Sequence, residues 1–403
     1  MLISRARGLS SENVDARCMV DFAPILTIKN FARIKMLKVT FERCVVIIGE
    51  QASGKSITCK LYYFFTQALK KITLLCLREE CDFDAFKKRL AQEFCAIFPE
   101  TAWRHDTFAL EWESGELKMK VTHNRGNKRV KFQLFDYENH YERVLKKVAK
   151  INSRKHREDE FDFRWRFDRV LQKNVRSEFA LPAVDYIPAG RSFFSTIQDT
   201  VFSLLSNNIG IDYFLKEFGQ KLESFRRMGG YERFEMPRQY STFEELCKKI
   251  VHGTYEFDGK EQWILDDKKH KVRLADASSG QQEVLPLLMV LARYKSWAQG
   301  RGGVKRIIIE EPEAHLYPTA QQQIIDFLGM LLRMSDSMGC IITTHSPFIL
   351  CCVNSALRQM RKARRMMSAY HLHDGIGDFI VDEDSGLINA ERFDDLSFSI
   401  AAS

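Results

Sequence analysis

The strongest chemical pattern in this chain is VVIIGEQASGKS at residues 45–56. Four β-prone apolar residues lead into Gly49, four residues follow, and Gly54-Lys55-Ser56 closes the pattern, which is the spacing of a phosphate-binding P-loop between a strand and a helix. The two glycines let the backbone wrap a triphosphate, and the loop N–H groups with the helix N-terminus form an anion cradle. Lys55 would place a positive charge on the β- and γ-phosphates, and Ser56 a hydroxyl on Mg²⁺. The residues expected to contact ATP here are Gly49, Gln51, Ala52, Ser53, Gly54, Lys55, Ser56 and Ile57.

A glycine turn between a strand and a helix would give the same short pattern without binding anything. The amphipathic run at 57–65, directly after the loop, favours the nucleotide-binding interpretation.

Two carboxylates follow a second apolar run, RIIIEEPEAHL at 306–316. Adjacent residues at the end of a strand point to opposite faces. Glu310 could therefore reach Mg²⁺ while Glu311 orients and deprotonates the attacking water. A helix cap is the structural alternative for such an acidic pair.

Two further stretches could contact phosphates. The run IITTHSP at 341–347 ends a buried strand in His345, which could donate a hydrogen bond to a γ-phosphate; a core histidine is the alternative. The run SSGQQ at 278–282 opens a helix, where small residues bring bare N–H groups and the positive end of the dipole to an anion. An ordinary serine N-cap is the alternative for Ser278 and Ser279.

The elements that must position these residues follow from periodicity. A helix should run from Lys55 to about Leu69. The densely charged stretch 141–178 reads as a salt-bridged exposed helix, with a DNA-contacting patch as the alternative. Between 196 and 227 a helix should carry an apolar stripe that packs on its own domain or docks a partner. That stripe comprises Phe202, Leu205, Ile209, Tyr213, Leu215, Phe218 and Leu222. Strands are expected within 25–41, 108–135, 184–187, 253–257, 262–265 and 271–274, and helices at 81–98 and 243–251.

In this order, the P-loop, the SSGQQ signature, the EEPEAHL Walker B and the TTHSP switch resemble the ABC-type ATPases of the OLD, RecF and SMC group. Residues 28–31 (IKNF) resemble the opening strand of that group, and 187–191 (IPAGR) the segment after the Q-loop position of OLD-like ATPases. The stretches 70–180 and 193–250 resemble no known motif.

The resemblance implies a role for each matched residue. Glu310 would take the metal position with Ser56, although most of the group has aspartate there. Glu311 would be the catalytic base of ATP hydrolysis to ADP and phosphate, and His345 the switch histidine. His315, with Leu316 in the D-loop, and Arg191 are carried over as candidate sensors. The implied cofactors are ATP and Mg²⁺.

The signature residues imply an assembly. In the group, this segment of one protomer completes the ATP site of another, so Ser278, Ser279, Gly280 and Gln281 would contact the partner's ATP. ATP-closed dimers or higher homo-oligomers are therefore expected.

The implied fold class is α/β: an ABC-type P-loop ATPase head whose mixed central sheet has an antiparallel β subdomain and carries helical insertions. The expected domains are an N-terminal extension (1–24), an N-terminal ATPase lobe (25–192) with a charged helical segment at 137–180, a helical insertion (193–250), and a C-terminal ATPase lobe (251–403) with signature, Walker B and switch histidine.

The chain departs from OLD nucleases and SMC proteins. Only 403 − 345 = 58 residues follow His345, without the acidic framework of a Toprim domain, and no heptad run is long enough for an SMC arm. This organisation resembles the stand-alone ATPases of anti-phage systems, such as the AriA and PtuA subunits. The expected function is therefore an ATPase that controls or scaffolds a separate effector, such as a nuclease, in anti-phage defence. The alternative is a RecF-like ATPase acting on DNA in repair or recombination. A transporter subunit and a small-molecule kinase fit less well.

Composition adds broad limits. Lys and Arg outnumber Asp and Glu by 61 to 53, which permits DNA or RNA as a partner without requiring it. Ten cysteines without a C-x-x-C pair favour a reducing compartment. Residues 1–24 lack the apolar core of a signal peptide, and the longest apolar run, 284–292, is too short to span a bilayer. A cytoplasmic protein with no membrane contact is expected.

Overall fold

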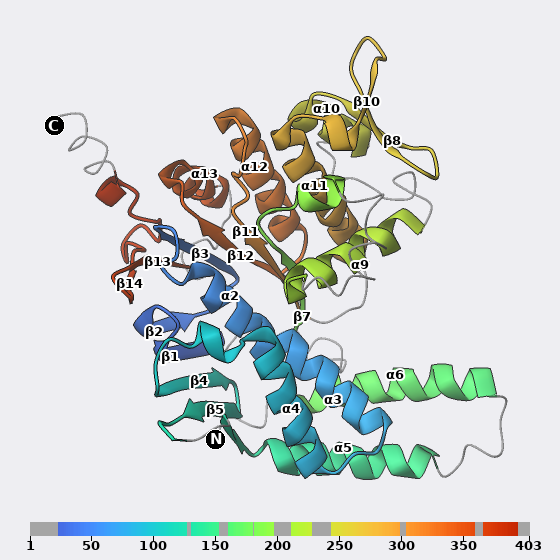
Figure 1. The fold of residues 1–403 in the computed structure, drawn as a ribbon, viewed down its shortest axis with the longest axis vertical. Helices are drawn as coiled ribbons and strands as arrows, with labels where there is room; N and C mark the ends of the chain where they lie inside the picture. Colours follow the sequence, from blue (N-terminus) through green and yellow to red (C-terminus); the bar gives the residue numbers. More distant parts are fainter. Residues whose placement is uncertain are drawn as a thin grey trace, which may run out of the picture.

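The computed structural model describes residues 23–126, 130–152, 160–179, 181–196, 211–227, 243–298, 304–358 and 366–393. Within these residues, an 11-stranded sheet has the strand order β6-β5-β4-β1-β2-β14-β13-β3-β12-β11-β7 (Figure 1). It mixes parallel and antiparallel pairs, and helices cover it on both faces. The expected α/β class with a mixed central sheet is therefore confirmed.

The parallel half of the sheet carries the site. It consists of β7 (Ala183–Ile187), β11 (Lys305–Glu310), β12 (Met338–Thr344), β3 (Cys44–Gly49) and β13 (Met367–His373). Every residue of β3 and β12 is buried, as expected for parallel strands covered on both faces. Because parallel strands end at the same edge, the residues that follow β3, β11, β12 and β7 lie close together.

The other half of the sheet is mainly antiparallel. It contains β1 (Ile25–Phe31), β2 (Ile34–Thr40), β4 (Phe108–Ser114), β5 (Leu117–His123) and β6 (Lys131–Phe135). The short β14 (Ile376–Phe379) pairs antiparallel with β13 and parallel with β2, and so joins the halves. The predicted strands within 25–41 and 108–135 are confirmed.

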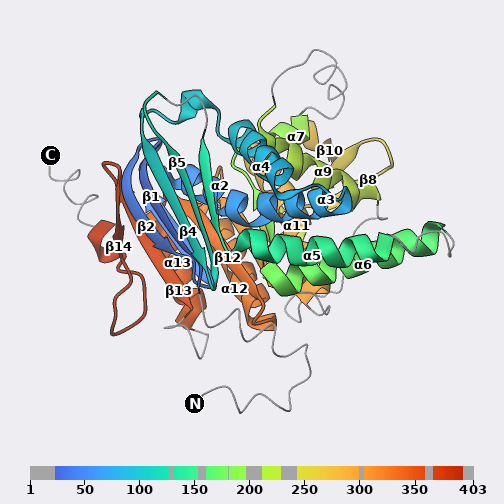
Figure 2. The same cartoon turned by 90° about the horizontal axis from the view of Figure 1, so that it is seen from below.

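Alternating side chains of the central strands enter two separate cores. Val45 and Ile47 of β3 pack into one core with the helices α2 to α6, whereas Val46 and Ile48 pack into the other with α9 to α13. The sheet is therefore the middle of three layers, and Figure 2 shows α3 to α6 gathered on one side of it.

The helix after the P-loop is longer than predicted. It comprises α2 (Lys55–Tyr63), the π-turn η1 (Phe64–Ala68) and α3 (Leu69–Arg78), without interruption. The predicted end near Leu69 is wrong because no helix-breaking residue occurs there. The π-turn is mostly buried, and its residues Phe64 and Phe65 lie in the core. The next helix, α4 (Phe83–Ile97), begins as expected, with the Asp82 side chain capping Ala85 N.

The charged stretch forms two helices rather than one, α5 (Tyr137–Asn152) and α6 (Glu160–Phe179). They lie side by side and project from the body (Figures 1 and 2). Arg143, Lys147 and His140 all contact the Glu178 carboxylate. Ion pairs between the two helices therefore account for part of this charge.

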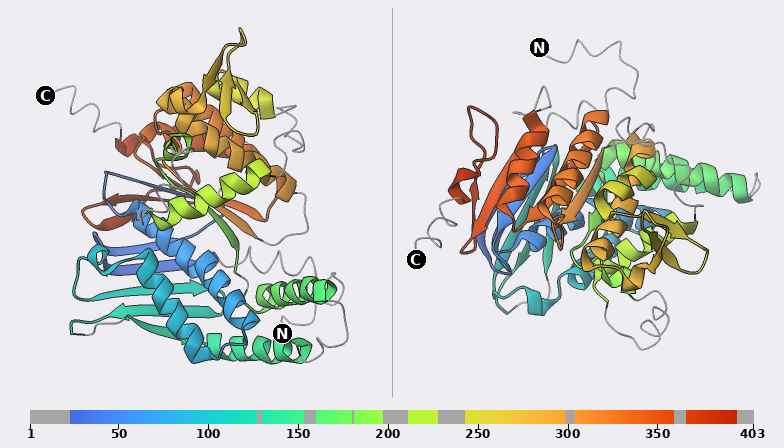
Figure 3. Two further views of the ribbon diagram at one scale, coloured as in Figure 1. Left: turned by 45° about the vertical axis from the view of Figure 1, so that its right-hand side comes forward. Right: turned by 90° about the horizontal axis from the view of Figure 1, so that it is seen from above.

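The remaining elements build the second core. They are α7 (Phe193–Thr196), α9 (Tyr213–Arg227), α10 (Phe243–Val251), α11 (Ser279–Ala298), α12 (Pro318–Met334) and α13 (Pro347–Arg358). A separate three-stranded sheet of β8 (Thr254–Phe257), β9 (Gln262–Leu265) and β10 (Lys271–Arg273) lies at the end of the molecule opposite the α5–α6 pair (Figures 1 and 3). Short 3₁₀ turns occur at η2 (Glu100–Ala102), η5 (Leu274–Asp276) and η7 (Glu391–Phe393).

Most of the described part of the predicted apolar stripe packs on its own fold. Phe218 and Leu222 of α9 lie in the second core, together with residues of α10 and α11. Phe214, which the predicted stripe omitted, lies in the first core, and the half-buried Tyr213 donates its hydroxyl to Glu93 at 2.8 Å. Leu215 is half-buried and belongs to neither core, and the other predicted members, Phe202, Leu205 and Ile209, lie outside the described residues. Packing on the chain's own fold is therefore observed for Tyr213, Phe218 and Leu222.

None of the helices that the structure describes combines the length and the apolar composition that a bilayer crossing requires.

Candidate nucleotide-binding site

The P-loop connects β3 to α2 in a conformation that requires its glycines. Gly54 has φ +110°, and a Cβ there would lie 2.6 Å from Ile34 Cγ1. A Cβ on Gly49 would lie 2.3 Å from the backbone oxygen of Leu372, which cannot move aside as a side chain could. Both positions therefore exclude a side chain for reasons of packing as well as of ligand approach.

The loop has the donors of an anion cradle. The first hydrogen bond of the helix runs from Thr58 N to Gly54 O at 3.0 Å, so the N–H groups of Lys55, Ser56 and Ile57 have no partner within the helix. The buried Ser53 Oγ has no hydrogen-bond partner among the described residues. These unsatisfied donors at a helix N-terminus fit a phosphate chain.

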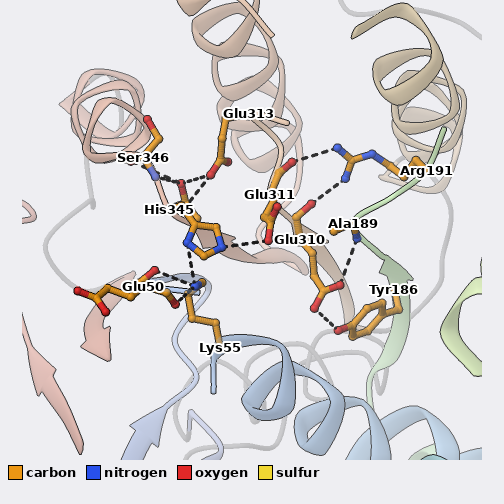
Figure 4. A network of polar contacts seen from close by, with 12 residues as sticks. Glu50, Lys55, Tyr186, Ala189, Arg191, Glu310, Glu311, Glu313, His345 and Ser346 are labelled. Atoms are coloured by element: carbon orange, nitrogen blue, oxygen red, sulfur yellow. Dashed lines mark hydrogen bonds and ion pairs between the residues drawn. The ribbon is translucent and has the colours of Figure 1, made fainter. Parts of the chain in front are cut away.

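Lys55, His345 and Glu311 form one chain of hydrogen bonds (Figure 4). The buried Lys55 Nζ donates to Gly49 O and Glu50 O, each at 2.7 Å, and lies 3.3 Å from His345 Nδ1. Because an ammonium group only donates, Nδ1 is the acceptor. We therefore assign the proton of the neutral ring to Nε2, which donates to Glu311 Oε1 at 3.1 Å.

The surroundings of Lys55 change its pKa in two opposite directions. Burial lowers its pKa, and the carboxylates of Glu311, Glu313 and Glu310 act in the opposite direction. The lysine is thus surrounded by the acids that end β11, and phosphate oxygens would supply further negative charge.

Glu310 is buried and faces the loop that follows β7 (Figure 4). Its Oε1 accepts from the Tyr186 hydroxyl at 2.8 Å, and its Oε2 accepts from Ala189 N at 3.2 Å. Burial, reinforced by the Glu310 charge, raises the pKa of Tyr186 and keeps it a donor. A carboxylate has about four lone-pair positions, so two bonds leave room for a cation. With the exposed Ser56 hydroxyl, this all-oxygen donor set fits Mg²⁺.

Glu311 occupies a strained backbone position at the end of β11. Its φ is +46°, in the left-handed region that non-glycine residues rarely adopt. Its N–H donates to Thr343 O at 2.9 Å, and its carbonyl accepts from Ala314 N at 3.1 Å. Strain of this kind persists only where the surroundings impose it, and it commonly marks functional sites.

Glu313 was not predicted from the sequence, although it is the third carboxylate of the EEPE run. Its Oε1 accepts from Thr344 Oγ1 at 2.6 Å and from His345 N at 2.8 Å. Its Oε2 is buried without a hydrogen-bond partner among the described residues. Glu313 therefore fixes the backbone that carries His345.

Arg191, a candidate sensor, is completely buried beneath the end of β11. Its guanidinium donates to the backbone oxygens of Glu310 at 2.7 Å and Glu311 at 3.0 Å, and its Nε lies 3.3 Å from the Glu283 carboxylate. Burial lowers its pKa, and Glu283 chiefly opposes that effect. The structure thus places Arg191 behind the acidic pair, in contact with its backbone.

The signature segment begins α11, where Ser278 and Gln281 form a capping box. Ser278 N and Oγ donate to Gln281 Oε1 at 3.1 and 3.0 Å, and Gln281 N lies 3.4 Å from Ser278 Oγ. The serine N-cap alternative is therefore realised. Ser278 and Ser279 are nevertheless exposed, and a Cβ on Gly280 would lie 2.6 Å from the backbone oxygen of His315. His315, the other candidate sensor, is exposed and has φ +58°.

Comparison with known proteins supports an ATPase. A family model described as AAA ATPase domain matches residues 191–350, which include the signature, the acidic pair and His345. No curated protein matches the chain.

Several solved structures are similar. The SMC head bound to the C-terminal winged-helix domain of ScpA has 14% identity and a TM-score of 0.45, covering 89% of this chain and 97% of that one. The SMC head domain from Thermotoga maritima has 13% identity and a TM-score of 0.38, covering 89% and 98%. The recombination mediator protein RecF has 12% identity and a TM-score of 0.33, covering 89% and 99%.

Proposed function

We propose that this protein binds ATP and Mg²⁺ at the P-loop and hydrolyses the γ-phosphate bond. The observation that carries the proposal is the chain of contacts from Lys55 through His345 to Glu311. These three residues come after three separate strands, β3, β12 and β11, and meet at one point. A P-loop lysine, a histidine and a carboxylate in contact are the parts that phosphoryl transfer to water requires.

Each residue then has a distinct task. Lys55 exchanges its bonds with Gly49 O and Glu50 O for bonds with phosphate oxygens, because these are better acceptors for an ammonium group. His345 is thereby released from Lys55, while Glu313 keeps its backbone in place. Glu311 accepts a proton from the attacking water. Mg²⁺, held by Ser56 and Glu310, would supply positive charge to the transferring phosphate.

The proposal extends to assembly and to a partner. The exposed start of α11, with Ser278, Ser279, Gly280 and Gln281, would complete the ATP site of a second copy, so that ATP closes a homodimer or a larger oligomer. That motion would control a separate effector, such as a nuclease, in anti-phage defence. The described cysteines are all free thiols, which fits the reducing cytoplasm.

Action on DNA, as in the RecF-like alternative, receives less support. Several basic residues of β5, of the turn after it and of α5 already have acidic partners on the same surface. These pairs are Lys118–Glu113, Lys120–Glu111, Arg125–Asp106, Arg143–Glu178, Lys146–Glu142 and Lys147–Glu178.

The assignment of Glu311 can be tested by turnover. Glu311→Gln protein should bind ATP normally but release phosphate roughly 10²–10⁴-fold more slowly, because the amide cannot accept the proton. Lys55→Ala protein should not bind ATP. Glu116→Gln, at an exposed glutamate away from the site, serves as the matched control. Turnover of Glu311→Gln near the wild-type rate would refute the assignment.

A further inference from the structure

A buried ion pair that makes several hydrogen bonds connects α11 to the end of β11. Glu283 lies in the second turn of α11, and both its side chain (3% exposed) and that of Arg191 (0%) are out of solvent. Glu283 Oε2 accepts from Arg191 N at 3.0 Å, and Oε1 accepts from Ser192 N at 3.1 Å and Ser192 Oγ at 2.9 Å. The carboxylate therefore holds the whole turn that follows β7.

The guanidinium is directed mainly at backbone carbonyls. Nε donates to Glu283 O at 3.1 Å, and Nη1 donates to Pro188 O at 3.1 Å and Glu310 O at 2.7 Å. Nη2 donates to Glu311 O at 3.0 Å. A buried ion pair contributes little net stability compared with apolar residues of similar volume, so stability alone does not explain this arrangement.

The contacts of Arg191 with Glu310 O and Glu311 O, at the end of β11, give a better reason for this buried ion pair. Glu310 O belongs to the peptide before Glu311, and Glu311 O to the peptide after it. Fixing both peptide planes fixes φ and ψ of Glu311, and hence the direction of its side chain. That residue has φ +46°, which an unsupported chain would leave. The Arg191 fork therefore holds the conformation in which Glu311 reaches His345 Nε2.

We propose that Arg191 and Glu283 are a positioning pair that sets the backbone of Glu311 and ties it to α11. The proposal rests on the proposed role of Glu311 as the base. Because Glu283 and the signature residues belong to the same helix, displacement of α11 moves the carboxylate, then Arg191, then the peptides on both sides of Glu311. Arg191 is thus neither a catalytic residue nor a contact of the nucleotide.

The test compares turnover with nucleotide affinity in Arg191→Met/Glu283→Met protein. Replacing both charges leaves no unpaired buried ion, so the fold should persist, whereas single removal is strongly destabilising. Loss of the hydrogen bonds to Glu310 O and Glu311 O should lower kcat on the order of 10²-fold, which is the effect of misplacing a catalytic group. KM should stay within twofold of the wild-type value. The single variant Arg191→Lys, which keeps the positive charge, should also have a lowered kcat, because one ammonium group cannot donate to both carbonyls as the planar guanidinium does.

Lys221→Met is the matched control. Lys221 forms a partly buried ion pair with Asp185 of β7, so its removal tests the loss of a cation beside β7 without touching Glu311. It should reduce stability and leave kcat unchanged. If it lowers kcat as much as the double variant does, the positioning role is refuted.

Hydrogen exchange of the backbone amides gives a second measurement that does not depend on turnover. The amides of Glu311 and of residues 313–316 should exchange at least about tenfold faster in the double variant than in wild-type protein, because the turn loses the hydrogen bonds that hold it. Unchanged exchange there would overturn the proposal, as would a change in KM with kcat unaffected, which indicates a nucleotide sensor. If wild-type protein does not hydrolyse ATP, the proposed function fails, and the exchange comparison still decides whether the pair holds the turn.

Discussion

Replacing Gly280 by alanine should change the free energy of unfolding in two opposite ways: a better helix former stabilises the protein, and a steric clash destabilises it. Alanine at a helical glycine normally stabilises by about 1 kcal/mol, because the unfolded chain loses freedom and helix propensity improves. Here the new Cβ would lie 2.6 Å from the backbone oxygen of His315 and 3.5 Å from Leu316 Cδ2. Carbon–oxygen contacts usually lie near 3.3–3.6 Å, so the two segments must separate by about 0.7 Å.

The His315 carbonyl has little freedom to yield. The residue has φ +58°, and hydrogen bonds from Ala314 N to Glu311 O (3.1 Å) and from Leu316 N to Glu313 O (3.0 Å) hold the turn around it. Overpacking of this kind costs about 1–3 kcal/mol. We therefore expect Gly280→Ala to lower the free energy of unfolding by about 1 kcal/mol, where an open helical glycine would give a gain.

The assay is urea denaturation followed by circular dichroism, with phosphate release measured on the same protein. Gly280→Ala should unfold at lower urea concentration and also release phosphate more slowly, because the displaced turn carries Glu311. The control is Ser279→Ala, at the exposed neighbour, whose stability should stay within about 0.5 kcal/mol of wild type. A variant Gly280→Ala that is as stable as wild type, or more stable, would show that the contact with His315 is not rigid.

Two further predictions concern the same site. If the start of α11 completes the ATP site of a second copy, mixing Lys55→Ala protein with Ser279→Asp protein should restore part of the ATPase activity, since mixed dimers keep one intact site; no recovery in demonstrated mixed dimers would argue for a self-contained site. Burial lowers the pKa of Lys55, so between that lowered pKa and the usual 10.5 the folded state loses its proton first and stability from this group rises with pH. The wild-type free energy of unfolding minus that of Lys55→Met should therefore increase with pH in this window, as measured by urea titration at several pH values; a flat or falling difference would contradict the burial of a charged lysine.

The sequence alone determined the parts of this protein that depend on neighbouring residues. The glycine spacing and Lys55 specify a P-loop locally, and the apolar runs before Gly49, Glu310 and His345 predict buried strands. These residues converge because β3, β12 and β11 are parallel in the structure and end at a common edge of the sheet. The roles of the site residues remain predictions, and the structure shows only that Lys55, His345 and Glu311 are in contact.

Tertiary structure decided which polar groups support that site. Arg191 and Glu310 are separated by 119 positions in the chain and meet only because β7 pairs with β11 in the sheet. Glu283 reaches Arg191 because α11 packs over the same edge, and Glu313 reaches Thr344 because β12 lies beside β11. A buried charge must find its partners among whatever the fold brings near it. The local sequence pattern does not show which distant residues will be neighbours. These partners could be identified only from the strand order and the helix packing of the fold.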